Sequence, residues 1–286
     1  MNNLGRGISV SVGGVDWEQA WHNYQDARTR PGSVEHWDKR AASYGSHSGG
    51  GEYERTFIER SGIKPGETVL DMGCGVGLLA IPLARMGCRV VCADFSSKML
   101  EGLERRAREA GVADRIEAYH MAWDDDWRAA GILPESVDVA ISSRSMATYN
   151  LTSAMTKLDE TARRRVCATV ASGRSPMKDE RAYEAVGRTR GVVSDYVFVI
   201  NVLLAHGIYP EVSYVITHSL PGFADHDDAF EKLSAMLGDD LTATEQGLLH
   251  RFLDEHYHEN PSAADYRTFE ADAEREVRWA FVSWGK

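Results

Sequence analysis

The stretch Thr68-Val-Leu-Asp-Met-Gly-Cys-Gly-Val-Gly-Leu-Leu79 decides the fold of this chain. Its first four residues, Thr68 to Asp71, are β-branched or apolar and end in an acid, which is typical of a short buried strand. Glycines follow at positions 73, 75 and 77, before an apolar segment that runs to Met86. Glycines at this spacing allow a tight turn and leave no Cβ between the main chain and a ligand. A helix after the turn would present free N–H groups, so we expect the first unit of a doubly wound α/β domain, which binds its ligand at the carboxyl ends of its strands.

A second predicted strand, Arg89-Val-Val-Cys-Ala-Asp94, also ends in an acid and continues into Phe95-Ser-Ser-Lys-Met-Leu-Glu101. An acid at the tip of this strand is placed to accept hydrogen bonds from both hydroxyls of a ribose. Dinucleotide-binding enzymes use the fingerprint G-x-G-x-x-G. The spacing here is G-x-G-x-G, and Asp71 stands two residues before the first glycine. The pattern therefore favours a nucleoside ligand other than a dinucleotide.

The segments Val69-Leu-Asp-Met-Gly-Cys-Gly-Val-Gly77 and Asp94-Phe-Ser-Ser-Lys-Met-Leu100 together resemble the class I S-adenosylmethionine-dependent methyltransferases. The resemblance implies their Rossmann-like fold, an α/β domain with a doubly wound, mostly parallel sheet of seven strands, and S-adenosyl-L-methionine as cofactor. It implies that Asp71 orients the turn, that Asp94 holds the ribose, and that the glycines admit the methionine half. The cofactor-binding residues expected on this basis are Asp71, Gly73, Cys74, Gly75, Gly77, Asp94, Phe95, Ser96, Met99, Trp123, Asp124 and Ser142.

The adenine contact departs from the family pattern. Family members commonly carry an acid just after the third strand, which is predicted here over Ile116–Met121. The nearest position in this chain is Ala122, followed by Trp123 and Asp124. Either Asp124 or Asp125 supplies the contact, or main-chain groups do so while Trp123 covers the ring. Phe95 and Met99 are expected to pack on the adenine.

The fourth predicted strand, Val137–Ser142, runs into the loop Ser143–Tyr149. In the family, loops at this point reach the reacting methyl group. The branch that methylates amino groups of nucleobases and glutamine has Asn or Asp, two prolines and an aromatic residue here, whereas this chain has Ser143-Arg144. No Pro-Cys pair occurs either, which disfavours the enzymes that methylate cytosine carbon. Arg144 either binds a carboxylate of the substrate or cofactor or forms a salt bridge within the loop. No residue identifies itself as a base, and the catalytic candidates are Tyr44, Arg144 and Tyr149.

Three helices are predicted before the first strand, over Val15–Arg28, Val34–Tyr44 and Tyr53–Ser61. In the first of them, Trp17, Trp21 and Tyr24 share one face. The stretch Trp37-Asp-Lys-Arg-Ala-Ala-Ser-Tyr44 resembles a short element that small-molecule methyltransferases carry before the first strand, so we expect Tyr44 or Trp37 to line the cofactor pocket. The predicted domains are a helical N-terminal cap (1–62), a cofactor-binding core (63–219), a helical insertion (220–275) and the last strand of the core (276–286).

The second half of the chain completes this expected fold. A helix is predicted over Leu151–Arg165, which places the basic run Arg163–Arg165 at its carboxyl end, where it suits the helix dipole. Insertions as long as the one before the last strand are usually functional, so we expect a lid or an oligomer contact, with a homodimer as one outcome. The remaining predicted elements are a strand over Val166–Ala171, a buried helix over Asp195–His206, strands over Val212–Thr217 and Val277–Trp284, and helices over Asp225–Leu237 and Thr242–His258.

The composition of the chain narrows the classes of molecule that it is expected to bind. The chain has 286 residues and a net charge of −11, which argues against nucleic acid as the substrate because binding to phosphates needs a cationic face. No apolar run reaches the roughly 18 residues that cross a bilayer, and the N-terminus lacks an apolar signal core, so we expect a cytoplasmic protein without membrane contact. All four cysteines are expected to be buried free thiols. His256 and His258 would point in different directions from a helix, and no H-E-x-x-H motif occurs, so no metal site is expected.

The sequence thus predicts a methyltransferase that uses S-adenosylmethionine and an unidentified small-molecule acceptor. Two alternatives remain at this point. One is a non-catalytic protein that binds the same cofactor as a regulator, since binding and turnover use the same glycines and Asp94. The other is a nicotinamide-dependent oxidoreductase, which the glycine spacing and Asp71 oppose.

Overall fold

The computed structural model describes residues 11–12, 14–27, 34–41, 44, 51–146, 148–173, 179–189, 194–238, 240–263 and 267–286. The chain folds into two compact units. The first comprises residues 1–170, 195–215 and 280–286, and the second comprises residues 171–194 and 216–279.

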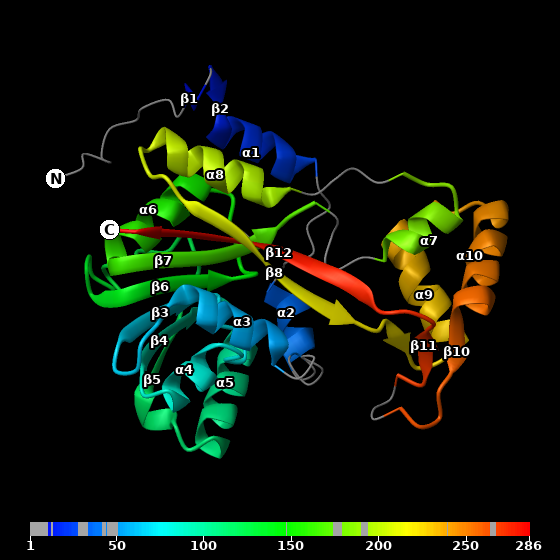
Figure 1. Cartoon of the computed structure of the whole chain (residues 1–286), viewed down its shortest axis with the longest axis horizontal. Coiled ribbons are helices and arrows are strands. Elements are labelled where there is room, and N and C mark those ends of the chain that lie inside the picture. Colours follow the sequence, from blue (N-terminus) through cyan, green and yellow to red (C-terminus); the bar gives the residue numbers. More distant parts are fainter. Residues whose placement is uncertain are drawn as a thin grey trace. The chain divides into compact units, whose positions relative to one another are not determined.

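A seven-stranded sheet with the strand order β5-β4-β3-β6-β7-β12-β8 is the centre of the fold (Figure 1). The four pairs β5–β4, β4–β3, β3–β6 and β6–β7 are parallel, and Figure 1 shows β12 running against its neighbours β7 and β8. The predicted doubly wound, mostly parallel sheet is therefore confirmed. Its strands are β3 (Thr68–Met72), β4 (Arg89–Asp94), β5 (Ile116–His120), β6 (Val137–Ser143), β7 (Ala162–Ala171), β8 (Glu211–Ser219) and β12 (Arg275–Gly285).

The helices of the first unit follow the expected order, including three before β3. The helix after the glycine turn begins at Ala80, so Pro82 lies in its first turn, where the missing N–H costs no hydrogen bond. These helices are α1 (Trp17–Asp26), α2 (Val34–Ala41), α3 (Glu52–Ser61), α4 (Ala80–Arg85), α5 (Ser97–Glu109), α6 (Leu151–Thr161) and α8 (Asp195–Ala205), with a 3₁₀ turn at Ala113–Arg115 and a hairpin of β1 (Ser11–Val12) and β2 (Val15–Asp16).

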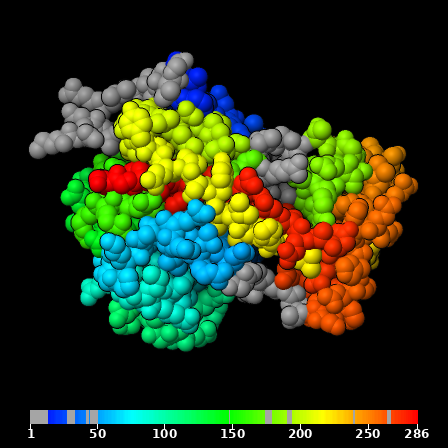
Figure 2. Space-filling view, viewed as in Figure 1, coloured from blue at the N-terminus to red at the C-terminus, as the bar shows by residue number. Residues whose placement is uncertain are grey.

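The aromatic face predicted in α1 packs into the core of the first unit. Trp21 is fully buried, and its indole N–H donates to the Thr148 carbonyl at 3.0 Å. The rings of Trp17, Trp21 and Tyr24 all contact Phe198 of α8. Figure 2 shows the blue surface of α1 beside the yellow-green surface of α8. This face therefore anchors the N-terminal segment to the domain.

The helix predicted to run to Arg165 ends at Thr161, and the prediction that the basic run closes a helix was wrong. The three arginines begin β7 instead. Their partners are carboxylates on other segments: Arg163 pairs with Asp138 at 2.9 Å, Arg164 with Glu67 at 2.9 Å, and Arg165 with Glu211 at 3.1 Å. These tertiary ion pairs outweigh the helix propensity of arginine, which is only a few tenths of a kcal/mol per residue.

The second unit has its own core. The two predicted helices are present as α9 (His226–Leu237) and α10 (Ala243–His256), but α10 ends before Tyr257, where the sequence pattern had extended it to His258. Residues Tyr257–Glu259 form β10, which pairs antiparallel with β11 (Phe269–Ala271), and β11 pairs with β9 (Gly222–Phe223). This small sheet was not predicted. Buried side chains of α7 (Glu180–Ala185), including Ala182 and Tyr183, join those of α9 and α10 in one cluster.

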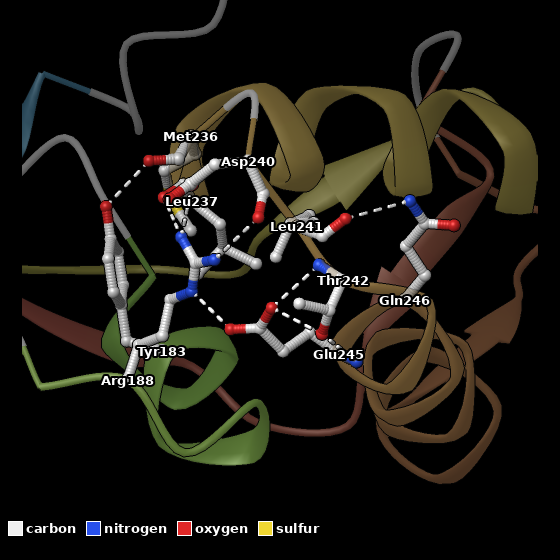
Figure 3. A network of polar contacts seen from close by, with 9 residues as sticks. All are labelled: Tyr183, Arg188, Met236, Leu237, Asp240, Leu241, Thr242, Glu245 and Gln246. Atoms are coloured by element: carbon white, nitrogen blue, oxygen red, sulfur yellow. Dashed lines mark hydrogen bonds and ion pairs between the residues drawn. The ribbon is translucent and has the colours of Figure 1, made fainter.

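Arg188 ties the connection between α9 and α10 together (Figure 3). Its guanidinium bonds Glu245 at 2.5 Å and Asp240 at 2.8 Å, and it donates to the Leu237 carbonyl at 3.2 Å. Glu245 also completes a capping box with Thr242 at the start of α10. The hydrogen bond from Arg188, together with the Thr242 donors, lowers the pKa of Glu245 to about 2. A single arginine thus supports the end of one helix and the start of the next.

We expect Arg188→Met to lower the melting temperature of the second unit by several degrees, because it removes the shared partner of Glu245, Asp240 and Leu237. Differential scanning calorimetry measures the change. Arg251→Met is the matched control, since Arg251 is exposed on α10. Equal melting temperatures for the two variants would contradict this role of Arg188.

Candidate cofactor-binding site

The turn after β3 is left-handed at each of its three glycines. Gly73, Gly75 and Gly77 have φ angles of 77°, 54° and 84°, which side chains with a Cβ rarely adopt. The backbone N–H groups of Gly73 and Cys74 both donate to the Ala93 carbonyl, at 2.7 and 3.1 Å. The turn is therefore fastened to the end of the neighbouring strand β4.

The glycines differ in what lies beside them. A Cβ at Gly73 would lie 2.3 Å from the Cβ of Ser145, and a Cβ at Gly77 would lie 2.4 Å from Leu103 on α5. Both distances are shorter than real Cβ atoms tolerate, so only glycine at these two positions lets Ser145 and Leu103 lie this close to the turn. A Cβ at Gly75 would meet the Tyr44 ring at 3.6 Å, an ordinary contact. The sequence had assigned all three glycines to the ligand, whereas Gly73 and Gly77 both face protein side chains.

Asp94, at the tip of β4, holds the turn from the other side. It is buried, and its two carboxylate oxygens accept hydrogen bonds from the backbone N–H groups of Gly75 and Ser96, each at 2.9 Å. Burial raises the pKa of Asp94, and these two hydrogen bonds oppose that rise. Each oxygen keeps a further lone pair, so the carboxylate can accept hydrogen bonds from a ligand as well.

Asp71 lies one strand away from Asp94 and is only 2% exposed. Burial, and next the negative charge of Asp94, raise the pKa of Asp71 to about 7. The structure therefore brings the two predicted acids together at the carboxyl ends of β3 and β4. A cation bound beside them would stabilise the charged form of Asp71.

The N-terminal segment covers this edge of the sheet. Tyr44 and Trp37 pack against a small buried cluster that contains Val76 and Met99. Asp38 of α2 accepts a hydrogen bond from the Ser96 hydroxyl at 2.6 Å, and the same hydroxyl caps the start of α5. The residue beside Gly75 is therefore Tyr44, one of the two aromatic residues that the sequence proposed for the pocket.

The segment after β5 reaches the same turn through Trp123. Its indole N–H donates to the Ser145 carbonyl at 2.9 Å, and Ser145 is the residue that contacts Gly73. Asp124 accepts a hydrogen bond from Asn150, and Asp125 accepts one from the Ala122 N–H, each at 2.8 Å. Both acids therefore stabilise loops. Of the three residues, Trp123 is the one that is linked to the turn, through Ser145.

The other predicted binding residues surround the turn. Ser142 is fully buried, and its hydroxyl lies 2.8 Å from that of Ser145, which in turn donates to the Met72 carbonyl at 2.7 Å. Cys74 is buried, and Phe95 is half-buried. The Phe95 carbonyl accepts a hydrogen bond from the ring of His120 at 2.9 Å.

The three catalytic candidates lie in different surroundings. Tyr149 stacks on His22 with a centroid distance of 4.2 Å and donates to Asp26 of α1 at 3.3 Å, so its contacts join a loop to the N-terminal segment. Arg144 lies over the ring of Tyr53, and Tyr44 lies beside Gly75. Sequence reasoning missed Tyr53, Asp38 and Ser145, because nothing in a local pattern indicates which distant strand a helix or loop will meet.

Comparisons with known proteins agree with this arrangement. The family model of a methyltransferase domain matches residues 69–165. A solved structure of geranyl diphosphate methyltransferase in complex with SAM has a TM-score of 0.50 at 13% identity and covers 90% of this chain and 92% of that one. The chain carries a class I S-adenosylmethionine-dependent methyltransferase domain.

Two proteins with similar sequences extend the comparison for this methyltransferase. It is 54% identical over 77 residues to a ubiquinone biosynthesis O-methyltransferase of Agrobacterium fabrum, a match that covers 27% of the chain and 28% of that enzyme. An uncharacterized protein of Haemophilus influenzae is 28% identical over 252 residues, which cover 87% of this chain and 88% of that protein. The match to the named enzyme thus covers about a quarter of this chain, and the match to the Haemophilus influenzae protein covers most of it.

Two further findings concern the described part of the methyltransferase. None of its helices is long and apolar enough to cross a membrane. Within the same residues, no group of three or more His, Cys, Asp and Glu side chains could hold a metal ion.

Gly73→Ala should destabilise the methyltransferase more than Gly111→Ala. Both glycines have a positive φ, 77° and 69°, but a Cβ at Gly111 has nothing within 4 Å. Alanine at Gly111 should cost about 1–2 kcal/mol for its backbone alone, and the collision with Ser145 should add about 1–3 kcal/mol at Gly73. Urea denaturation measures both. The companion change Ser145→Gly should recover part of the loss at Gly73, and a failure to do so would argue against this contact.

Asp71→Asn should alter the pH dependence of stability in the ligand-free protein. The folded pKa of about 7 lies above the ordinary 3.8, so the folded state binds more protons and stability falls as pH rises from about 4 to 7. Each pKa unit by which the folded and unfolded states differ corresponds to about 1.4 kcal/mol of folding free energy. Asparagine does not titrate, so the variant should lose this decrease in stability and should be more stable than the unaltered protein at pH 8. Urea denaturation at several pH values tests the expectation, with the exposed Asp114→Asn as control; parallel curves for all three proteins would contradict it.

Proposed function

We propose that this methyltransferase binds S-adenosylmethionine across the carboxyl ends of β3 and β4 and transfers its methyl group to a small-molecule acceptor. The observation that carries the proposal is Asp94, a buried carboxylate at the tip of β4 that is already bonded to the glycine turn. A ribose bound there would receive two fixed acceptor atoms. The geometry supports a nucleoside whose remainder extends along the turn.

The residues of the site suit the chemistry of this cofactor. The methionine half carries an ammonium group and a sulfonium, and a cation bound beside the turn would favour the charged form of the buried Asp71. The Tyr44 ring, next to Gly75, offers an aromatic face that attracts a cation. Phe95, Met99 and Trp123 are the apolar side chains proposed for the adenine.

When bound, the cofactor supplies an electrophilic methyl group on a sulfonium. The residues of the chain have to align the acceptor atom with that methyl group and exclude water, and such positioning can contribute up to about 7–11 kcal/mol in favourable cases. A general base is required only if the attacking atom carries a proton at the working pH. The proposal therefore assigns binding and positioning to the residues around the turn, and it assigns no base.

A small molecule is the proposed acceptor for two reasons. The net charge of −11 disfavours a polyanion. The N-terminal segment also lies over the turn through Trp37 and Tyr44, which leaves the reacting end partly covered by protein. The four cysteines are free and buried, which suits the reducing cytoplasm proposed as the location.

Asp94→Ala should weaken the binding of S-adenosylhomocysteine at least tenfold, because it removes the proposed acceptor of the ribose hydroxyls. Isothermal titration calorimetry measures the dissociation constant. Because Asp94 also bonds Gly75 and Ser96, circular dichroism should first establish that the variant is folded at the titration temperature. The exposed Asp114→Ala is the control and should bind as the unaltered protein does. An unchanged dissociation constant for a folded Asp94→Ala would exclude this carboxylate from the cofactor site.

A further inference from the structure

Ser96 joins the Asp94 carboxylate to the N-terminal segment. The residue is fully buried. Its backbone N–H donates to Oδ1 of Asp94 at 2.9 Å, and its hydroxyl donates to Oδ1 of Asp38 at 2.6 Å. The same hydroxyl oxygen accepts the Met99 N–H at 3.1 Å, which is the capping bond of α5. One serine thus contacts two carboxylates through two different donors, one carboxylate at the tip of β4 and the other on α2.

Asp38 determines where the single proton of the Ser96 hydroxyl points. A hydroxyl donates one hydrogen bond and has two lone pairs that accept. A separation of 2.6 Å between a hydroxyl and a carboxylate oxygen is typical of a charge-assisted hydrogen bond, so the proton is committed to Asp38. The Ser96 oxygen is then left as an acceptor for the Met99 N–H, as the start of α5 requires.

Without Asp38, the buried hydroxyl proton of Ser96 would need another acceptor, because an unmet buried donor is unfavourable. Asp94 is the carboxylate that Ser96 already contacts through its backbone N–H. A hydroxyl that turned to Asp94 would occupy a lone pair that the proposed function reserves for a ribose hydroxyl. The bond to Asp38 therefore prevents Ser96 from competing with the ligand for Asp94.

The negative charge of Asp38 does not explain its position. Burial raises the pKa of Asp94, and the charge of Asp38 adds to this rise, so the two carboxylates disfavour each other's ionised forms. Apolar packing holds α2 in place, because Trp37 and Ala41 lie in the same cluster as Met99 of α5. The hydrogen bond to Ser96 is thus the favourable contact that Asp38 makes beside Asp94, and a neutral acceptor of the same shape would provide it as well.

We propose that Asp38 is a positioning residue of the cofactor site, which holds the Ser96 hydroxyl and so keeps the Asp94 carboxylate available to the ribose hydroxyls. This inference rests on the proposed function. It gives α2 a part in the recognition of the ribose, although Asp38 itself acts only through Ser96.

The experiment compares the unaltered protein with Asp38→Ala, Asp38→Asn, Ser96→Ala and the double variant Asp38→Ala/Ser96→Ala. Lys39→Ala, a change of the exposed neighbour on α2, is the control. Isothermal titration calorimetry measures the dissociation constants of S-adenosylhomocysteine, adenosine and 2′,3′-dideoxyadenosine, which lacks both ribose hydroxyls. Thermal melting establishes that each variant is folded, and Asp38→Leu, which also lacks an acceptor, replaces Asp38→Ala if that variant is unfolded.

The decisive quantity is the dissociation constant of 2′,3′-dideoxyadenosine divided by that of adenosine. This ratio measures the contribution of the ribose hydroxyls, and a looser α2 that weakened both nucleosides equally would leave it unchanged. The ratio should be at least ten for the unaltered protein and should fall at least threefold in Asp38→Ala, with a similar loss of affinity for S-adenosylhomocysteine. Asp38→Asn should keep the ratio, because its amide oxygen still accepts the Ser96 hydroxyl, and Lys39→Ala should keep it too.

The double variant tests the route through Ser96. In the Ser96→Ala background, the further change Asp38→Ala should leave the ratio as it is, because the proton that Asp38 holds is already gone. An equal fall in the ratio with and without the Ser96 hydroxyl would overturn the proposed route.

Two other outcomes concern different claims. Hydroxyl-dependent binding by the unaltered protein, with the same ratio in folded Asp38→Ala or with a lowered ratio in Asp38→Asn, would overturn the role of Asp38 and leave the proposed function intact. Failure of the unaltered protein to bind S-adenosylhomocysteine and both nucleosides would overturn the proposed function and the role of Asp38 with it.

Discussion

Two hydrogen bonds to the buried carboxylate of Asp94 hold the site together, one from Gly75 and one from Ser96. A carboxylate in such surroundings loses its hydration, and backbone donors are the compensation that the fold supplies. The bond to Gly75 keeps the turn in its left-handed conformation, and the bond to Ser96 fixes the start of α5. Asp71 differs from Asp94, because burial and the Asp94 charge both raise its pKa. The paired acids therefore store unfavourable electrostatic energy that a bound cation would relieve.

The glycine turn meets protein on two sides. Ser145 occupies the space beside Gly73, and Leu103 occupies the space beside Gly77. Both contacts require a glycine, so two members of the G-x-G-x-G pattern are explained by packing. The outer glycines join the loop after β6 and the helix α5 to the turn, and this fixes the surfaces between which Gly75 is presented. A motif that is interpreted as a binding signature thus also sets how three segments of the domain meet.

The sequence was sufficient for the sheet and for the pair of acids, because both depend on local patterns: an apolar run, an acid at its end, and glycines after it. It was insufficient where a residue far away in the sequence determines the local structure or the contacts of a side chain. The start of β7 depends on carboxylates such as Asp138 and Glu67, which pair with its arginines. The role of Tyr53 depends on strand ends about 90 residues or more further along the chain. Strand β10 depends on its pairing with β11. Periodicity contains no information about such contacts.

The strand order adds a last constraint on the ligand. Neighbouring strands β4 and β3 carry Asp94 and Asp71, whereas β6 leads into Arg144, which is held by Thr169 of β7. The carboxyl edge of the sheet is therefore negative along one pair of strands and carries a cation beside the next pair. An electrostatic gradient of this kind favours a ligand whose positive and negative groups are arranged in the opposite order. Because Coulomb interactions strengthen where water is excluded, this ordering would act most strongly at the covered end of the turn, beside Tyr44.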